Sequence, residues 1–416
     1  MRVISIDRLQ PGMFISLESV GWMDHPFLLN RFRISNTKQI QALRRMGLTS
    51  IDWDPERSSV GPLSERPSAV SMPLPENDLT AGALQAMMNS KRERVMQVRE
   101  RREDIARCAR LFEQETGQIR QVLEEVSARP NDAHTHGRVM VDRIVGGLVD
   151  AGSVAVHLVN LKKPETGAPN HAMNVLVVSL LIGKALDLSA DDMRQLGLGA
   201  LLHDVGLAEI PMRVQRNQHR SEAEERFYRA HTGYGLKLVA PMRELPLAVK
   251  NIIACHHENW DGKGYPNALA GVKIPKLARI VAIANRYDNL CNPLDPKLAR
   301  PPAEAVAHMF KNERDAFDPE IFGVFVKALG VYPPGTFVAL EDGTYGLVIE
   351  SNSRDLLRPL LMLYDASVPR SEALLLDVKE SDEKIAAAVS PHDLPREVIE
   401  YLAPQGRVDF YLEGAK

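Results

Sequence analysis

Two short stretches of this sequence concentrate side chains that bind metals. "HHENWDGKGYP", residues 256–266, sets two adjacent histidines and a glutamate before a turn rich in glycine, and "LLHDVG" places His203 beside Asp204. Imidazole suits divalent transition metals such as iron and manganese, and a carboxylate can bridge two ions and offset their charge. These residue types predict a metal centre.

The histidines gather in one part of the chain. Six of the twelve lie between residues 171 and 257. A single histidine is more often packed or solvent-facing than a ligand. Several in one helical region, with a His-Asp pair and a glycine-rich loop, favour metal binding. The candidates are His171, His203, His231, His256 and His257.

Other residues of this region fit less specific roles. His219 and His308 are expected at the surface, and Glu258 and Trp260 fit packing or N-capping of the loop as well as a chemical role.

Length, charge and cysteine content bound the class of protein. A chain of 416 residues favours two to three domains. Lys and Arg (51) nearly balance Asp and Glu (54), which argues against a nucleic-acid partner. Three dispersed cysteines indicate neither a disulfide framework nor a thiolate zinc site. The N-terminus shows no signal peptide and the longest apolar run, residues 175–182, is too short to span a bilayer, so we expect a cytoplasmic protein without a membrane span.

Local patterns predict a multidomain, mainly α protein. An all-α helical bundle is expected between a small N-terminal α+β domain and a small β-rich C-terminal domain. The predicted segments are residues 1–60 as the α+β domain, 61–80 as a flexible linker, 81–130 as a long amphipathic helix, 131–330 as the bundle and 331–416 as the β-rich domain.

Residues 84–126 carry apolar side chains at alternating steps of four and three. A repeat of 3.5 residues is typical of a coiled-coil seam. Two interpretations stay open: the helix pairs with its copy in a homodimer, or it docks on its own domain.

Four elements carry a specific resemblance. In this order, "LLHDVG", "HTGYGLKLV", "HHENWDGKGYP" and "ARIVAIANRYDNL" resemble the HD-GYP subgroup of bacterial HD-domain phosphohydrolases, which hydrolyse the second messenger cyclic di-GMP. The resemblance covers about half the chain, and the first domain looks like the small module that often precedes such a bundle. It implies an HD-type bundle and a metal-dependent phosphodiesterase that converts cyclic di-GMP to linear pGpG, with GMP as the product of a second cut.

The resemblance also implies a set of site residues. Two divalent ions, iron or manganese, are expected on His171, His203, Asp204, His231, His256, His257 and Asn285, with Asp204 as the bridge. His203 and Asp204 are assigned the catalytic role. Substrate contacts are expected from Asp261, Gly264, Tyr265, Pro266 and Arg286. The loop with Gly264 implies a diguanylate cyclase (GGDEF) partner as well.

The glycines of this loop have a predicted purpose. Gly262 and Gly264 are expected to leave space beside the metals, where a Cβ would obstruct a large dinucleotide.

The sequence departs from the family pattern at several positions. The lysine of "HDxGK" is Leu207, and the late metal-binding aspartate of "ADxYDAL" is Asn285. Leucine cannot replace a charge on phosphate, and an amide oxygen brings no negative charge to a metal. Gly167 stands where some members have a glutamate for a third ion, and "NPLDPKLARPP" replaces the basic "RPYR" segment.

Basic residues elsewhere could compensate: Arg286 or Arg213 for the lost lysine, and Lys297 or Arg300 for the segment. The departures leave an alternative to the active enzyme, namely a catalytically weak or inactive protein that binds cyclic di-GMP or a diguanylate cyclase. A hydrolase of another nucleotide is a third interpretation.

Overall fold

The computed structural model describes residues 1–21, 24–27, 30–64, 81–149, 154–159, 167–352, 357–366, 368, 370, 373–379, 381, 383–402 and 408–414. The chain divides into two compact units. One consists of residues 1–103 with 339–344 and 365–374, and the other of residues 104–338 with 345–364 and 375–416. Within the described ranges, no helix is long and apolar enough to cross a bilayer.

The N-terminal residues form an antiparallel sheet with strand order β1-β4-β2-β3 and one amphipathic helix. β-prone runs bounded by turn residues predict strands in "MRVISI", "MFISL" and "FRIS" and a helix in "TKQIQALRRMG", and the structure has β1, β2, β3 and α1 there. The strand β4 was not predicted. The elements are β1 (Arg2–Ser5), the 3-10 turn η1 (Ile6–Arg8), β2 (Phe14–Ser16), β3 (Arg31–Arg33), α1 (Thr37–Arg45) and β4 (Ser50–Asp54). The predicted linker, 61–80, lies mostly outside the described residues.

The long helix expected at 81–130 is α2 (Ala81–Ala128), and α3 (Pro130–Val149) follows it. Phe112, Ile119 and Val126 are buried in the same hydrophobic cluster as side chains of α3, α4 and α5. This supports docking on its own domain for the second half of α2. Self-pairing of the helix stays a prediction.

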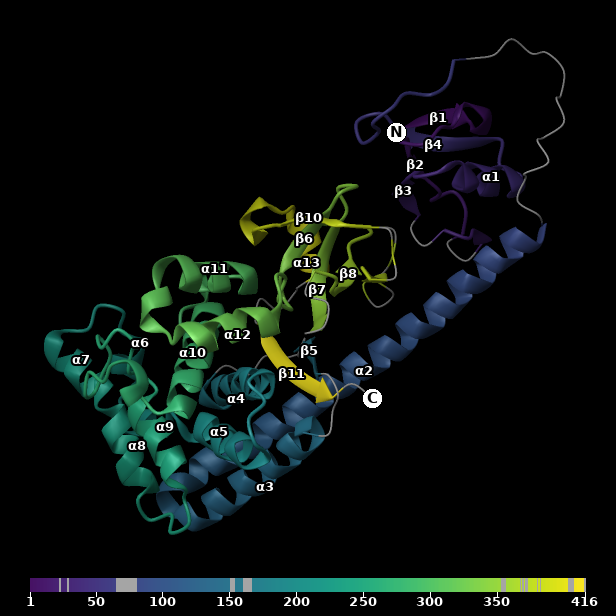
Figure 1. The fold of residues 1–416 in the computed structure, drawn as a ribbon. Helices are drawn as coiled ribbons and strands as arrows, with labels where there is room; N and C mark the ends of the chain where they lie inside the picture. The colour runs from purple at the N-terminus through teal and green to yellow at the C-terminus, as the bar shows by residue number, and fades with distance from the viewer. Residues whose placement is uncertain are drawn as a thin grey trace. The chain divides into compact units, whose positions relative to one another are not determined.

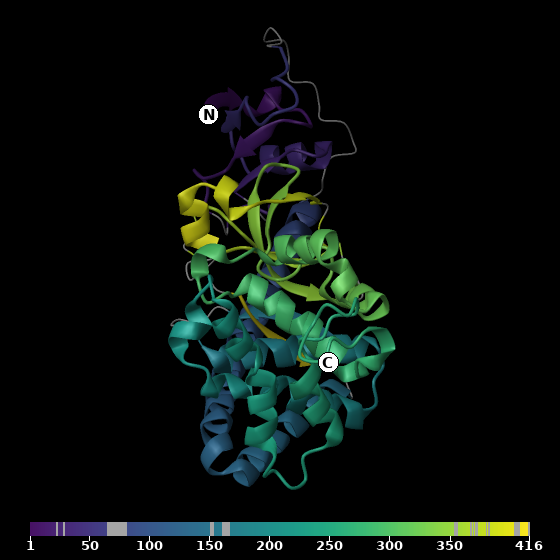
Figure 2. The same cartoon turned by 90° about the vertical axis from the view of Figure 1, so that its left-hand side faces the viewer.

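Helix α4 (Ala168–Ala185) lies at the centre of the bundle, because the run "NVLVVSLL" is apolar on every face and is buried throughout. Figures 1 and 2 show the teal and green helices grouped around it. The remaining elements are α5 (Ala190–Leu202), η3 (Val205–Glu209), α6 (Met212–Arg216), α7 (Glu222–Arg229), α8 (His231–Val239), α9 (Leu247–Cys255), η4 (Gly271–Lys273), α10 (Lys276–Cys291), η5 (Pro296–Leu298), α11 (Pro302–Asn312), η6 (Arg314–Ala316) and α12 (Pro319–Leu329).

A second sheet follows the path β10-β6-β7-β5-β11, with β8 beside β7 and β9 beside β8. Its later elements are β6 (Phe337–Leu340), β7 (Tyr345–Asn352), β8 (Leu360–Leu363), β9 (Leu375–Asp377), β10 (Ile385–Ala388), η8 (Pro391–Asp393), α13 (Arg396–Leu402) and β11 (Asp409–Gly414). The turn pair Asp342-Gly343 and the apolar runs "RPLLMLYD" and "EALLLDV" predict strands, and β6, β7, β8 and β9 confirm them.

One strand of this sheet was missed. β5 (Val154–Val159) comes from the segment expected to be wholly helical, yet it pairs antiparallel with both β11 and β7. Its partners lie about 200 residues or more away in sequence, so no local signal indicates the pairing.

The close approach of η3 to α8 yields a stability prediction. A Cβ on Gly206 would lie 1.9 Å from the carbonyl oxygen of His231 and 2.4 Å from the amide nitrogen of Gly235. Gly206→Ala should therefore lower the free energy of unfolding by about 1–3 kcal/mol, since backbone atoms cannot move aside as a side chain can.

Gly233→Ala is the matched control, because a Cβ there meets nothing within 4 Å. It should raise stability by up to about 1 kcal/mol through helix propensity. Urea unfolding measures both; equal midpoints for the two variants would contradict the packing argument.

Candidate metal centre

Six of the seven predicted ligands, all except Asn285, lie at the ends of four helices of the bundle. His171 is in the first turn of α4, His203 and Asp204 directly follow α5, His231 begins α8, and His256 and His257 directly follow α9. These positions agree with the sequence expectation. Helix ends bring side chains from distant segments to one place while the helix bodies stay in the core.

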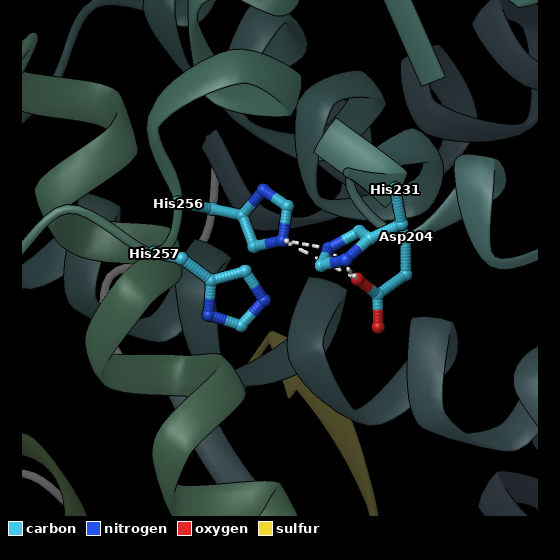
Figure 3. Close-up of side chains that lie close together, drawn as sticks. All are labelled: Asp204, His231, His256 and His257. Carbon is cyan, nitrogen blue, oxygen red and sulfur yellow. Dashed lines mark hydrogen bonds and ion pairs between the residues drawn. The ribbon is translucent and has the colours of Figure 1, made fainter. Parts of the chain in front are cut away.

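The other side chains gather around Asp204. Figure 3 shows it with three of the histidines, His231, His256 and His257. Its Oδ1 atom lies 3.3 Å from Nε2 of both His231 and His256. Its Oδ2 atom lies 3.5 Å from Nε2 of both His171 and His203. Two groups of potential ligands share this carboxylate: Asp204, His231, His256 and His257, and His171, His203 and Asp204.

Hydrogen bonds to the backbone fix the orientation of three imidazoles. From Nδ1, His203 donates to Ala200 (2.7 Å), His231 to Tyr228 (2.8 Å) and His256 to Ile252 and Ile253 (3.2 and 3.1 Å). These carbonyls belong to the last turns of α5, α7 and α9, where backbone acceptors are not all used within the helix. A carbonyl only accepts, so each Nδ1 carries its proton and each neutral ring turns an Nε2 lone pair towards Asp204.

The Nε2 atoms approach one another in pairs. They are 3.3 Å apart in His171 and His203, and 3.4 Å apart in His231 and His256. Two lone pairs at this distance repel each other unless a positive charge lies between them. In addition, Oδ1 of Asp204 is buried, and although it is within ion-pair distance of two rings, no donor reaches it with hydrogen-bond geometry. This chemistry and geometry fit divalent cations.

The pKa shifts of the metal-free site follow the same pattern. Burial alone would lower the pKa of His171, but hydrogen bonds to Asp204 and Asp288 raise it to about 10. Burial would also lower the pKa of His231, but the hydrogen bond to Asp204 and the charge of that carboxylate raise it. By contrast, burial lowers the pKa of His256 to about 4. A proton on His171 thus occupies the first nitrogen pair where a cation would lie, and the raised pKa of His231 favours one in the second pair.

The carboxylate and the last histidine are shifted further. Burial would raise the pKa of Asp204, but the charge of His203 and bonds from the surrounding rings hold it well below the usual value. Burial and the neighbouring imidazoles lower the pKa of His257 well below its usual value. At neutral pH the bridge is therefore ionised and His257 is neutral, as ligation requires.

Asp288 is a residue of the site that the sequence analysis did not recognise. Its Oδ2 atom accepts a hydrogen bond of 2.6 Å from Nδ1 of His171, so it orients that ring as a carboxylate partner. Asn285 lies one turn earlier on α10, is buried, and accepts from Asn289 at 2.6 Å. Its role as a ligand stays a prediction. Asn285 and Asp288 are three residues apart, so they lie on one face of α10. This spacing is the sequence signal that could have identified Asp288 as part of the site.

The loop after His257 is held by its own backbone contacts. Glu258 is buried and accepts from the amides of Asn267 (2.7 Å) and Leu269 (2.9 Å), so it closes the loop as the packing interpretation expected. A Cβ on Gly264 would lie 2.3 to 2.6 Å from backbone atoms of residues 257–259. The loop's packing on its own backbone thus requires a glycine at this position, and clearance for a dinucleotide stays a prediction.

The other expected loop residues are distributed around this turn. The ring of Tyr265 stacks on His257 with centroids 4.6 Å apart, and Pro266 follows it. Asp261 accepts from the amide of Lys263 at 3.0 Å and pairs with its ammonium at 3.1 Å. Gly262 has a φ of +76°, which favours glycine.

The basic residues proposed to replace the missing lysine have different surroundings. Arg286 donates twice to Glu313, at 2.7 and 2.5 Å, so the protein already occupies its guanidinium. Arg213 is exposed, and Leu207 is half-buried in η3. His219 is exposed as expected, whereas His308 is partly buried and bonds to Glu313 at 3.1 Å.

Comparisons with known proteins agree with this architecture. Residues 153–321 match the HD domain family, and residues 1–134 match a domain of unknown function (DUF3391). A cyclic di-GMP phosphodiesterase of Pseudomonas aeruginosa is 28% identical over 88% of this chain and 85% of its own length. A 3'3'-cGAMP-specific phosphodiesterase of Vibrio cholerae is 32% identical over 42% of this chain and 38% of its own length.

Among solved structures, an HDG"Y"P protein from Bdellovibrio bacteriovorus is 15% identical and aligns with a TM-score of 0.44 over 78% of this chain and 97% of its own. The family match and the two enzymes confirm the resemblance that the four sequence elements predict. Residues 153–321 of this chain are therefore similar to the HD domain family.

Proposed function

We propose that this chain is a metal-dependent phosphodiesterase that hydrolyses cyclic di-GMP to pGpG, with GMP as the product of a second cut. The observation that carries the proposal is the half-buried carboxylate of Asp204, shared by two groups of imidazoles. The relative from P. aeruginosa, named a cyclic di-GMP phosphodiesterase, aligns over most of both chains and supports this substrate. The action belongs to bacterial second-messenger signalling.

The donor set supports iron or manganese as the metal. Histidine nitrogens and one carboxylate suit these ions, and the two groups offer no thiolate. When bound, the ions supply polarisation of a phosphodiester oxygen and lower the pKa of water. His203, in one ligand group, and Asp204, shared by both, would act by holding the ions at the reacting phosphate, with Asn285 as a further oxygen ligand.

Loop residues would position the dinucleotide. Burial raises the pKa of Tyr265 well above its usual value, so its hydroxyl stays protonated and can donate to a phosphate oxygen. Asp261, Gly264 and Pro266 would shape the turn that carries it. Arg286 could contact substrate only by exchanging its bonds to Glu313.

We also propose that this loop serves as a surface for a diguanylate cyclase partner, and that α2 pairs in a homodimer. The exposed ammonium of Lys263 supports the first, since it offers charge to an acidic surface. The heptad pattern of α2 supports the second. A purely binding role is less favoured than hydrolysis, because the expected histidine and aspartate ligands are all present. Four of the histidines turn Nε2 towards the carboxylate of Asp204.

Removing the shared carboxylate tests the function directly. Asp204→Ala should release both ions and reduce hydrolysis of cyclic di-GMP on the order of a thousandfold, since several kcal/mol of transition-state stabilisation depend on the ions. Chromatography of pGpG and GMP, with protein loaded anaerobically with Fe(II) or Mn(II), gives the rates.

His219→Ala is the matched control, because this histidine is exposed. It should keep both ions and full activity. Parallel reactions with 3'3'-cGAMP identify the preferred dinucleotide. A wild-type protein that carries metal but forms no product would contradict the proposal and favour the binding role.

The two departures from the family pattern should have modest effects. Asn285→Asp adds a negative ligand and should tighten metal binding, and Leu207→Lys adds a phosphate contact and should lower KM. We expect each to raise kcat/KM by less than about tenfold, which corresponds to the roughly 0.5–1.5 kcal/mol net contribution of one typical hydrogen bond. A rise from near zero to full activity in the double variant would instead indicate that the natural protein is a degenerate member.

Metal binding should release protons. The raised pKa of His171, about 10, keeps this ring protonated at pH 6–8 without metal, and the pKa of His231 is raised in the same direction. His256, with a pKa of about 4, needs no proton loss. Affinity should therefore increase with pH by roughly tenfold per unit for each proton displaced.

Titration calorimetry in two buffers of different ionisation enthalpy counts these protons. His171→Ala should release about one fewer, because the proton it would have lost is absent. Affinity that does not change between pH 6 and 8 would contradict the competition between proton and metal.

A further inference from the structure

The carboxylate of Asp288 is bonded on both of its oxygens. Oδ2 accepts from His171 at 2.6 Å, and Oδ1 accepts from the amides of Asn174 and Asn292, each at 2.8 Å. Asp288 and Asn174 are fully buried. In a buried network each bond restricts the next, so the two asparagines determine how Asp288 presents its second oxygen to His171.

Both asparagines are in turn held by the C-terminal segment that leads into β11. Asn174 donates to Oδ1 of Asp409 at 3.1 Å and accepts from the amide of Phe410 at 3.1 Å. Asn292 donates to the carbonyl of Val408 at 2.7 Å and accepts from its amide at 3.2 Å. Figure 1 shows β11 as the yellow arrow that runs beside the bundle at α4.

The chemistry of an amide makes these contacts directional. An asparagine whose oxygen accepts from a backbone amide must turn its NH2 group the other way. Because the amides of Val408 and Phe410 fix the oxygens, the nitrogens of Asn292 and Asn174 are aimed at Asp288. Without the strand, either amide could flip and set an oxygen against the carboxylate.

We propose that β11 is a positioning element of the metal centre, acting through Asn174 and Asn292 on Asp288, and through Asp288 on His171. This inference rests on the metal binding proposed above. Its target is the ligand group of His171, His203 and Asp204. In the other group, His231 and His256 have their own backbone bonds and do not depend on the strand.

Substitutions on the helix and on the strand test the proposal. Asn174→Ala and Asp409→Ala should each weaken binding of the ion held by His171 about 10- to 100-fold, the usual effect of losing a partner behind a ligand. Asp409→Asn keeps an oxygen that accepts from Asn174 and should bind nearly as the wild type does.

The control for stability is Phe410→Leu. It removes ring contacts with Tyr287 but keeps the backbone amide that binds Asn174. Urea unfolding of the metal-free variants shows which of them are folded and equally destabilised. Phe410→Leu should lower the stability of the protein without weakening its affinity for the ion held by His171.

The readout is titration with Mn(II) followed by electron paramagnetic resonance, which separates spin-coupled pairs from single ions. We expect pairs in the wild type, Asp409→Asn and Phe410→Leu, and single ions at limiting Mn(II) in Asn174→Ala and Asp409→Ala. Coupled pairs with unchanged affinity in both alanine variants would overturn the proposal, as would equal loss in Phe410→Leu.

Failure of the proposed function would look different. A wild type that holds Mn(II) pairs but leaves cyclic di-GMP intact contradicts the hydrolase and leaves the comparison among variants valid. A wild type that binds no Mn(II) contradicts the metal centre and the role of β11 together.

Discussion

Repulsion between nitrogen lone pairs is the constraint on which the rest of this site depends. Four imidazoles turn Nε2 towards one half-buried carboxylate, and two pairs of these atoms come within 3.3 to 3.4 Å. Such an arrangement persists only with a positive charge in each pair, either a proton or a cation. The helix ends, the last-turn carbonyls and the carboxylate behind His171 all serve to keep the rings in this otherwise unfavourable orientation.

The same constraint explains why the site lies inside a helical bundle. A loop could bring the residue types together, but it could not hold rings against their mutual repulsion. Helix α4 is buried on every face, and α5 and α9 pack against the same core, so their ends cannot separate without exposing apolar surface. Burial of the bundle thereby stabilises a charge arrangement that is unstable by itself.

Much of this could be predicted from the sequence because its signals are local. Ser189 caps α5 through the amide of Asp192, and Gly47 with a φ of +75° follows α1, as short-range patterns indicate. The histidines were recognisable by type and clustering. What could not be predicted depends on contacts between distant residues.

Three features illustrate that limit. Pairing of β5 with β11 joins residues about 250 positions apart. The role of Asp288 requires knowing which ring faces it, and the reason for Gly264 requires knowing that its own backbone closes over it. In each case the residue type permitted several roles, and only the three-dimensional neighbour selects one.

The position of β5 determines whether the bundle and the sheet can be separated into independent fragments. Because this strand precedes α4 in the chain yet lies between β7 and β11, the sheet is not a self-contained cassette that follows the bundle. A chain cut after α12 would leave β5 with two unpaired edges, which template association with other chains. A recombinant fragment should therefore contain the bundle and the sheet together.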